Sequence, residues 1–245
     1  MLRDAVGQHL DHEPHFRWRG ESVTRIENLS DIAFALALGM LISGIDAPTT
    51  YPELIRFLVF IIPAAAGFAV LLSVWSAHYT FFRRYGLTDK RVIFYNAVLI
   101  FLVLYMAYPL RFAFDSFFAF VIGVSTGDVS RNLEIGVSSF EISGRIIAIF
   151  GVIYGMLFSV ISLMYVHALR QAEVLQLNAY ELAMTQRACF ARGFEACLAF
   201  GVAALAWFTN LNGFAGGLLF FTWVPYVWGR KIFPVQADDS QESPA

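Results

Sequence analysis

Runs of apolar residues separated by short polar stretches make up most of the chain, and they predict helices that cross a lipid bilayer. A helix needs about 20 mostly apolar residues to span a hydrocarbon core of about 30 Å, because it must satisfy its own backbone hydrogen bonds there. The first run, 32–45, reaches this length only if the polar stretch 25–31 belongs to the same helix. The further runs are 54–82, 92–110, 146–169, 196–208 and 214–228.

The fifth run, 196–208, is the shortest. It extends back to Phe190 only if the helix accepts Arg192 and Glu195. Residues 209–213 are of turn-forming types, so the fifth and sixth runs should form a helical hairpin. The pattern therefore predicts an all-α protein, a six-helix transmembrane bundle with both termini on one side.

The Lys and Arg residues are distributed unevenly between the two sides of this predicted bundle. Cytoplasmic loops of membrane proteins are enriched in these residues. If the N-terminus is cytoplasmic, thirteen of the seventeen lie inside, and the four outside are Arg56, Arg111, Arg131 and Arg145. We therefore expect a cytoplasmic N-terminal tail at 1–24, a six-span membrane domain at 25–230 and a cytoplasmic C-terminal tail at 231–245.

The segments outside the apolar runs carry weaker signals. The outer linker, 112–143, mixes Phe with Gly, Asp, Arg and Glu and predicts a folded or interfacial loop. Residues 1–24 are too polar for a cleaved signal, and 236–245 has no apolar periodicity and is expected to be disordered. The tail histidines His9, His12 and His15 could bind a metal, but we favour the interpretation that they belong to a mobile surface tail.

Composition excludes two classes of function. Hydrophobic residues make up 58% of the chain and charged residues 15%, whereas soluble domains average about 45–50% and about 25%. A water-soluble enzyme is therefore excluded. The net charge of -2 provides no positive surface for phosphates, so we expect no nucleic-acid partner. Cys189 and Cys197 are interpreted as free thiols, and nothing indicates a metal or an organic cofactor.

Several polar side chains lie where the predicted helices are in lipid. Ionisable residues at such depth are costly and mark functional sites by default. The first helix opens with Arg25, Glu27, Ser30 and Asp31, and the later helices add His78, Asn96 and His167. Three interpretations stay open from the residues alone: a structural network that shapes a helix, a transport or proton relay, or interfacial groups that bind water.

Leu36, Met40 and Ser43 lie on one face of the first helix, at positions i, i+4 and i+7. The same helix carries small residues at Ala33, Ala35, Ala37 and Gly39, which let neighbouring backbones approach closely. The stripe is either ordinary core or the wall of a central path that is closed by dewetting.

Residues 25–31, Arg-Ile-Glu-Asn-Leu-Ser-Asp, resemble the Arg-x-x-x-Phe-Ser-Asp signature that opens the first helix of the transmembrane protein 175 family, the lysosomal and bacterial potassium channels. Further residues follow in that family's order, namely Trp75-x-x-His78-x-x-Phe81-Phe82-Arg83, Asp89, Asn96 and Tyr108-Pro109. The specific match covers 25–110, whereas 146–228 agrees only in hydropathy.

The resemblance implies a homotetrameric potassium channel of the bacterial inner membrane, with the first helices around a central pore. Lipids, potassium and other monovalent cations would be its partners, and potassium would be the permeant ion rather than a cofactor. The pore constriction of the family maps to Leu36, with Met40 and Ser43 as the next layers. The family's polar network, which supports the pore helix, maps to Arg25, Ser30, Asp31, Trp75, His78 and Asn96.

Three residues depart from the family pattern. Leu29 replaces the signature Phe, Gly39 replaces a common Thr, and Ser43 replaces a bulky aliphatic residue. Without that outer apolar layer the pore should be wider there, and an apolar ring offers no oxygen to replace the hydration shell of an ion. We therefore expect only modest selectivity for potassium over sodium.

Two alternatives compete with a channel. A proton-coupled secondary transporter could use a buried Asp31/His78 pair, although no pair of broken helices suggests inverted repeats. An intramembrane enzyme could use Ser30 and His78, but the chain has no motif typical of a hydrolase or a zinc protease. We therefore expect that the protein is not an enzyme.

Overall fold

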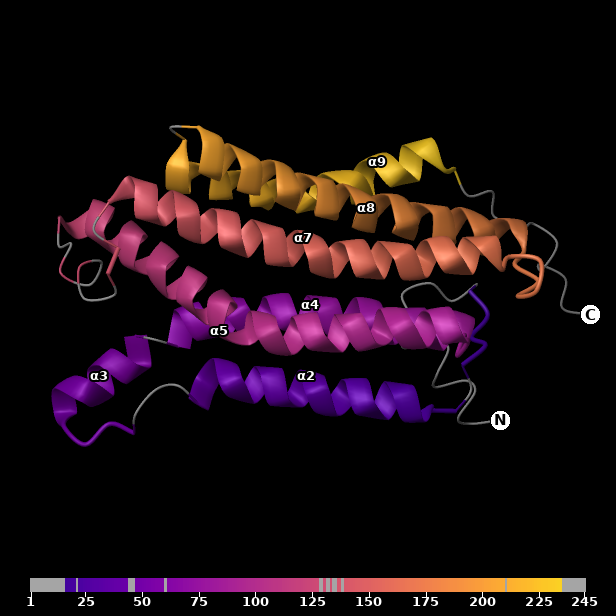
Figure 1. Cartoon of the computed structure of the whole chain (residues 1–245), viewed down its shortest axis with the longest axis horizontal. Helices are drawn as coiled ribbons and strands as arrows, with labels where there is room; N and C mark the ends of the chain where they lie inside the picture. The colour runs from indigo at the N-terminus through magenta and orange to yellow at the C-terminus, as the bar shows by residue number, and fades with distance from the viewer. Residues whose placement is uncertain are drawn as a thin grey trace, which may run out of the picture.

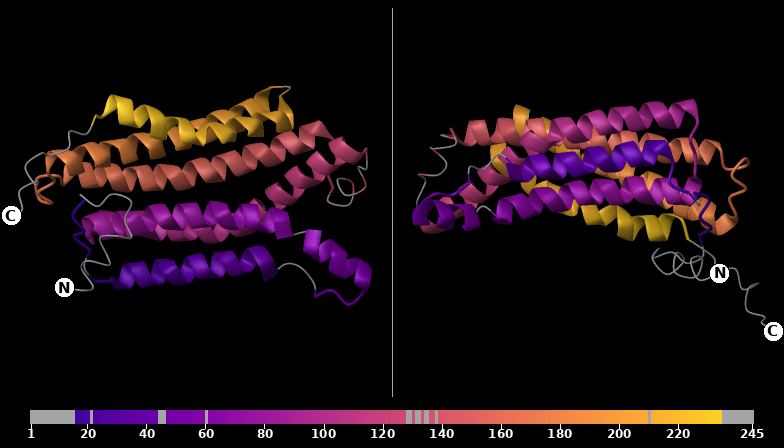
Figure 2. Two further views of the ribbon diagram at one scale, coloured as in Figure 1. Left: turned by 180° about the vertical axis from the view of Figure 1, so that it is seen from behind. Right: turned by 90° about the horizontal axis from the view of Figure 1, so that it is seen from below.

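The computed structural model describes residues 16–20, 22–43, 47–59, 61–127, 130, 133, 136–137, 139–209 and 211–234, and within these residues it is all-helical, without strands. The helices are α2 (Arg25–Ser43), α3 (Tyr51–Val59), α4 (Ile61–Tyr85), α5 (Lys90–Thr126), α7 (Phe140–Arg170), α8 (Ala179–Phe208), the 3-10 helix η1 (Asn212–Trp223) and α9 (Val224–Ile232). Most of the helices lie roughly along a common axis in an elongated bundle, whereas α3 and the last part of α5 are inclined to it (Figures 1 and 2).

Four helical stretches among the described residues are long and apolar enough to cross a membrane, which agrees with the predicted class of protein. They are Tyr51–Tyr85, Lys90–Gly123, Glu141–Arg170 and Ala179–Phe208. The other two predicted spans correspond to α2 and to η1 followed by α9. The count of six spans therefore stays a prediction.

Helix α2 begins at Arg25, so the polar stretch 25–31 belongs to the same helix as the first apolar run. Its 19 residues extend over about 27 Å at about 1.5 Å per residue. The helix lies at the edge of the bundle and contacts only α4 and α5 among the described elements (Figures 1 and 2). One side of α2 is therefore left without a neighbour from the described part of its own chain.

The second predicted span, 54–82, is divided between two described helices. Helix α3 ends at Val59, α4 begins at Ile61, and the two run in different directions (Figure 1). Pro63 lies in the first turn of α4, and it has no N–H group to donate to the carbonyl of Val59 four residues earlier.

The prediction of a loop from 112 to 143 is wrong over its first half. Helix α5 continues through 112–126 and ends only at Gly127, which adopts the left-handed conformation with a φ of 77°. Pro109 lies inside α5, and Figure 1 shows the helix changing direction part-way along its length. A proline removes one backbone bond and bends a helix, but packing on both sides of the bend keeps this one continuous.

Two later helices begin earlier than the apolar runs predicted. Helix α7 starts at Phe140, where the hydroxyl of Ser139 accepts the backbone N–H of Ile142. Helix α8 starts at Ala179, after a capping box in which Asn178 and Glu181 each accept the other's backbone N–H. These caps satisfy N–H groups at the helix start that have no partner within the helix, so polar residues can open both helices.

Two charged residues inside α8, Arg192 and Glu195, are paired with each other. Arg192 donates to Glu195 at 2.9 Å, and the hydroxyl of Tyr226 in α9 donates to the other oxygen of Glu195 at 2.8 Å. The guanidinium of Arg192 also lies 5.5 Å from the ring centre of Phe158 in α7. This cluster lets the apolar helix accept both charges and links α8 to α9 and α7.

The predicted hairpin at residues 209–213 brings η1 back along α8 and α7 (Figure 1). The returning segment is first a 3-10 helix of 12 residues and becomes α-helical only at Val224. Pro225 occupies one of the first two positions of α9, where the missing N–H group costs no helical hydrogen bond.

Helices α7 and α8 pack closely because of two glycines. A Cβ atom on Gly151 would lie 2.8 Å from the carbonyl oxygen of Ala199, and one on Gly155 would lie 3.0 Å from the ring of Phe200. Small residues at such positions let helix backbones approach each other in membranes.

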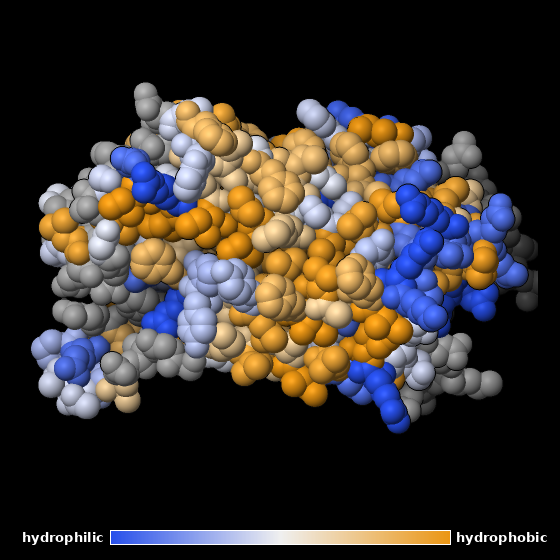
Figure 3. All heavy atoms as spheres, in the orientation of Figure 1, coloured by the Kyte–Doolittle hydropathy of each residue, from blue (hydrophilic) through white to orange (hydrophobic). Residues whose placement is uncertain are grey.

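One end of the bundle, which we call the basic end, carries Arg83, Arg84, Lys90, Arg170 and Lys231. Here α2, α5 and α8 begin and α4, α7 and α9 end. Figure 3 shows hydrophilic side chains gathered at this end of the visible face, a smaller group at the opposite end, and hydrophobic side chains between. This distribution is the one a bilayer requires.

Candidate functional site

The first turn of α2 is capped and anchored at the basic end. Thr24 and Glu27 form a reciprocal capping box, with the Glu27 carboxylate accepting the Thr24 N–H at 2.9 Å and the Thr24 hydroxyl accepting the Glu27 N–H at 3.3 Å. The second oxygen of Glu27 pairs with the guanidinium of Arg83 at the end of α4. Both side chains are buried, so the pair fixes the start of α2 against α4.

Ser30, His78 and Asn96 meet in one buried cluster between α2, α4 and α5, and each is at most 2% exposed. Asn96 Oδ1 accepts from His78 Nε2 at 2.8 Å, and Asn96 Nδ2 donates to Ser30 Oγ at 2.9 Å. The Ser30 hydroxyl then donates to the carbonyl of Ile26 at 2.9 Å. This set of donors gives each of these polar atoms a partner, as burial requires.

Asp31 and Trp75 form a second contact beside the cluster. The indole N–H of Trp75 donates to Asp31 Oδ1 at 2.9 Å, and the indole ring stacks on Tyr79 with ring centres 5.5 Å apart. Asp31 is exposed, unlike Ser30. The aspartate therefore lies at the border between the packed and the open sides of α2.

The six residues of the predicted network are thus not all brought together. Arg25 is exposed and makes no hydrogen bond or ion pair with any residue that the structure describes. Conversely, sequence reasoning missed the pairing of Glu27 with Arg83. The Thr-x-x-Glu pattern at 24–27 predicts the cap, but nothing local identifies an ion-pair partner 56 residues away.

The side of α2 away from α4 and α5 is an open, mostly apolar face. Leu36 is 56% exposed and Ile32 67%, and a Cβ atom on Gly39 would meet nothing within 4 Å. Residues on this face recur every three or four positions, as one side of a helix requires. They are Asn28, Leu29, Ile32, Ala35, Leu36, Gly39 and Ile42.

The other two residues of the predicted constriction are placed differently from Leu36. Met40 is half-buried and packs partly against the core of its own chain. Ser43 is the last residue of α2, and its side chain lies outside the described part of the structure. Of the two stripe residues whose side chains are described, Leu36 is exposed and Met40 is half-buried.

His167 bonds to Asp89 rather than to the cluster around Ser30. Its Nε2 atom lies 3.0 Å from Asp89 Oδ2, and its side chain is 3% exposed. Asp89 is the residue before α5, and His167 lies in the last turn of α7. This contact joins the start of α5 to the end of α7 at the basic end.

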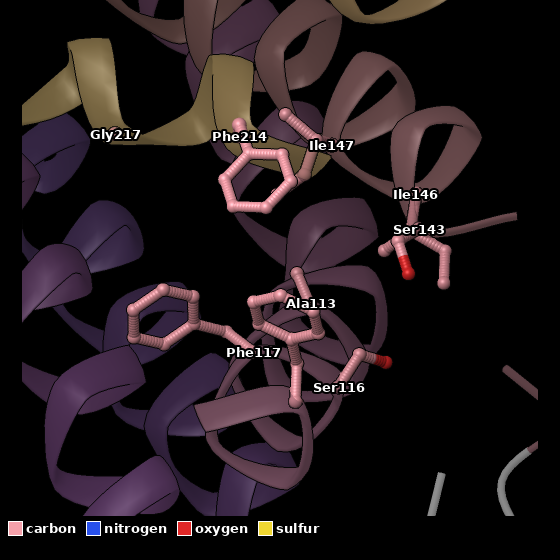
Figure 4. Close-up of a pocket in the computed structure, with 9 residues that line it drawn as sticks. Ala113, Ser116, Phe117, Ser143, Ile146, Ile147, Phe214 and Gly217 are labelled. Atoms are coloured by element: carbon pink, nitrogen blue, oxygen red, sulfur yellow. The ribbon is translucent and has the colours of Figure 1, made fainter. Parts of the chain in front are cut away.

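A cavity of about 150 Å³ lies between α5, α7 and η1 (Figure 4). Its lining is mostly apolar and includes Phe117, Ile147 and Phe214. The hydroxyls of Ser116 and Ser143 already donate to backbone carbonyls, at 2.8 Å and 3.3 Å. No residue of α2 lines it, so the cavity is separate from the polar cluster.

No metal site appears within the part of the chain that is described, where no three His, Cys, Asp or Glu side chains are grouped to hold an ion. The tail histidines His9, His12 and His15 lie outside the described residues, as does most of each predicted tail.

Comparison with known proteins gives a consistent result. The model of the family described as endosomal/lysosomal potassium channel TMEM175 matches residues 25–107. A potassium channel from Marivirga tractuosa is 32% identical over 234 residues, which cover 89% of this chain and 90% of that protein. A crystal structure of a variant of the potassium channel MtTMEM175, bound to a nanobody fusion, superposes with a TM-score of 0.75 at 32% identity, covering 89% of this chain and 97% of the other.

Proposed function

Because the chain belongs to the TMEM175 family of potassium channels, we propose that it conducts potassium through a pore lined by α2. It is an integral membrane protein. The proposed channel is a homotetramer whose six spans lie within 25–230, in a bacterial inner membrane. The tails 1–24 and 231–245 are cytoplasmic, as the basic end of the bundle is. Channels of this family are not enzymes, and potassium is the cargo rather than a cofactor.

The observation that carries this proposal is the open face of α2. A helix that packs on one side and leaves an apolar face free at the edge of its subunit can meet copies of itself around an axis. Four such helices enclose a narrow path. Leu36, the exposed residue of the stripe nearest the middle of α2, forms the tightest ring in this proposal.

Met40 and Ser43 line the path on either side of that face. At 100° per residue, Met40 is turned by about 40° from Leu36 and Ser43 by about 20° the other way. Met40 therefore contributes less to the ring than Leu36. Ser43 and Gly39 make the outer part of the path wider and wetter, which supports modest selectivity for potassium over sodium.

The polar network holds α2 on the side that faces α4 and α5. The cluster of Ser30, His78 and Asn96 lies on the packed side, and the bond from Trp75 to Asp31 holds the next position. Within one chain Arg25 has no such bond in the described structure. Its place in the network therefore depends on a contact that the assembled channel supplies.

The structure gives no support to the transporter alternative. A direct relay between Asp31 and His78 needs those two groups in contact, but Asp31 bonds to Trp75 and His78 bonds to Asn96. The family and the homologous potassium channel also favour a channel.

The proposal is tested by ion flux into liposomes that contain the purified protein. We expect potassium flux down its gradient that keeps rising with millimolar concentration, that persists after a proton ionophore collapses the pH gradient, and that exceeds sodium flux moderately. Flux that saturates at millimolar potassium and stops without a proton gradient would instead establish a coupled transporter. Empty liposomes are the control for leak.

A further inference from the structure

The N-terminal strap, residues 16–20, crosses the basic end of the bundle before the chain enters α2. The backbone N–H of Arg17 donates to Glu181 Oε1 at 2.9 Å, and the N–H groups of Arg19 and Gly20 both donate to the carbonyl of Arg83 at 3.1 Å. Phe16 is 4% exposed and packs edge-on against Tyr85. These contacts fix the strap to the bundle.

The side chain of Arg19 joins the strap to the turn between α7 and α8. Its two terminal nitrogens bind the two oxygens of Glu181 at 3.0 and 2.6 Å. Its Nε atom donates to the carbonyl of Leu175 at 2.8 Å. A bidentate guanidinium pair of this kind is directional. Arg19 therefore fixes the strap to the first turn of α8.

Arg83 joins the same strap to the first turn of α2. One terminal nitrogen donates to the carbonyl of Gly20 at 2.8 Å, and the other pairs with Glu27. The backbones approach so closely that a Cβ on Gly20 would collide with the carbonyl of Phe82. A Cβ on Gly86, which has a φ of 60°, would lie 2.9 Å from the carbonyl oxygen of Arg19. The strap therefore has one fitted position.

We propose that the N-terminal strap positions the first turn of α2 and that Arg83 is the positioning residue through which it acts. This rests on the function proposed above. Glu27 lies on the packed side of α2, opposite the open face around Leu29 and Ile32. A bond on that side holds the start of α2 away from the channel axis, so releasing the strap lets the four first turns move inward and narrows the inner mouth of the pore.

The test compares two variants that release the strap with one that does not. Arg19→Ala removes the bonds to Glu181 and Leu175, and Gly20→Ala displaces the strap sterically. Arg17→Ala is the matched control, because it removes an exposed charge two residues away while its bonded group, the backbone N–H, remains. We expect the first two to lower initial potassium flux by about threefold or more, with an unchanged ratio of potassium to sodium flux, and the control to behave as wild type.

Hydrogen exchange of the peptide that covers residues 16–27 reports the strap directly. The amides of Arg17, Arg19 and Gly20 should be protected in the wild type and should exchange faster in both release variants. Arg19→Lys keeps a cation beside Glu181 and should recover part of the protection and part of the flux. If the variants lose protection while flux stays at the wild-type level, the strap does not position the pore helix.

Failure of the inference is distinguishable from failure of the proposed function. Wild-type protein that conducts no potassium would overturn the channel itself. A conducting wild type with insensitive Arg19→Ala and Gly20→Ala variants would overturn only the role of the strap. A change in the ratio of potassium to sodium flux would also contradict it. The strap holds the first turn of α2 at Glu27, and the proposed ring at Leu36 lies about 14 Å further along that helix.

Discussion

At the scale of single residues, exposure separates two positions that the sequence could not separate. Leu36 and Met40 are both apolar and one helical turn apart, yet Leu36 is 56% exposed and Met40 packs partly into its own chain. An exposed leucine in a membrane protein is usually explained by lipid. Leu36 differs because it lies on the same helix as a capped, ion-paired and hydrogen-bonded polar start.

Replacing Leu36 by Asn should raise potassium flux and lower discrimination against sodium. The substitution puts a hydrogen-bonding group into the ring, so water enters it more easily. Flux of both ions in liposomes measures the effect. Leu163→Asn is the matched control, since Leu163 is 46% exposed on α7, which does not contact α2. Equal currents through both variants would remove Leu36 from the pore.

Replacing Asn96 by Ala should destabilise the protein. The change removes the partner of both His78 and Ser30, and an unsatisfied buried polar group costs about 1–3 kcal/mol. Thermal unfolding in detergent measures the loss. Asn28→Ala, at an exposed position of α2, should change the melting temperature less. A melting temperature for Asn96→Ala equal to that of the control would show that the cluster contributes no stability.

At the scale of elements, two prolines show what sequence could and could not predict. Pro63 lies just after the change of direction between α3 and α4, whereas α5 continues past Pro109 for 17 residues to Thr126. A proline inside a helix costs about 3 kcal/mol or more, and only tertiary packing decides whether that cost is offset. Hydropathy therefore located the helices, but it could not decide where α3, α5, α7 and α8 begin or end.

The candidate site, too, could be predicted from the sequence only in part. Ser30, His78 and Asn96 were identified through the order of a family motif, and the capping box at 24–27 is local enough to be recognised. The ion pairs are not local, because Glu27 and Arg83 are 56 residues apart and Arg19 and Glu181 are 162 apart. Such partners are known only once the fold brings two helix ends together.

Gly151→Ala should destabilise the packing of α7 on α8. The added Cβ would lie 2.8 Å from a backbone oxygen, which cannot move without shifting α8. Gly201→Ala is the matched control, because a Cβ there meets nothing within 4 Å and should gain up to about 1 kcal/mol from helix propensity. Melting temperatures should therefore move in opposite directions. A Gly151→Ala protein as stable as wild type would contradict the close approach.

At the scale of the whole molecule, charge and apolar surface are arranged for assembly in a bilayer. The basic end gathers cationic residues from the ends of α4, α5, α7 and α9, and α2 occupies the edge of the bundle rather than its centre (Figures 1 and 3). In the proposed channel, a single subunit supplies one wall of the path but not the path itself. Function, in this proposal, begins only with the oligomer.

Cysteine cross-linking tests that arrangement. After Cys189 and Cys197 are replaced by Ser, Leu36→Cys should form a covalent dimer on oxidation in membranes, because a disulfide requires Cβ atoms about 3.5–4.5 Å apart and a tight ring brings them to that range. Leu163→Cys should remain monomeric. Non-reducing gel electrophoresis distinguishes the two, and equal cross-linking of both variants would show that α2 has no special proximity to its copies.

The neighbours of α2 also suggest how far this sequence can diverge. The helix contacts α4 and α5 and no other described helix, and the stretch that the family model recognises, 25–107, covers α2 through α4 and the first half of α5. The family model thus matches α2 together with the two helices that α2 packs against, α4 and the first half of α5. We therefore expect relatives to differ widely in α7, α8 and α9 as long as those helices stay apolar. A substitution on the surfaces of α4 and α5 that contact α2 should instead be accompanied by a substitution in α2.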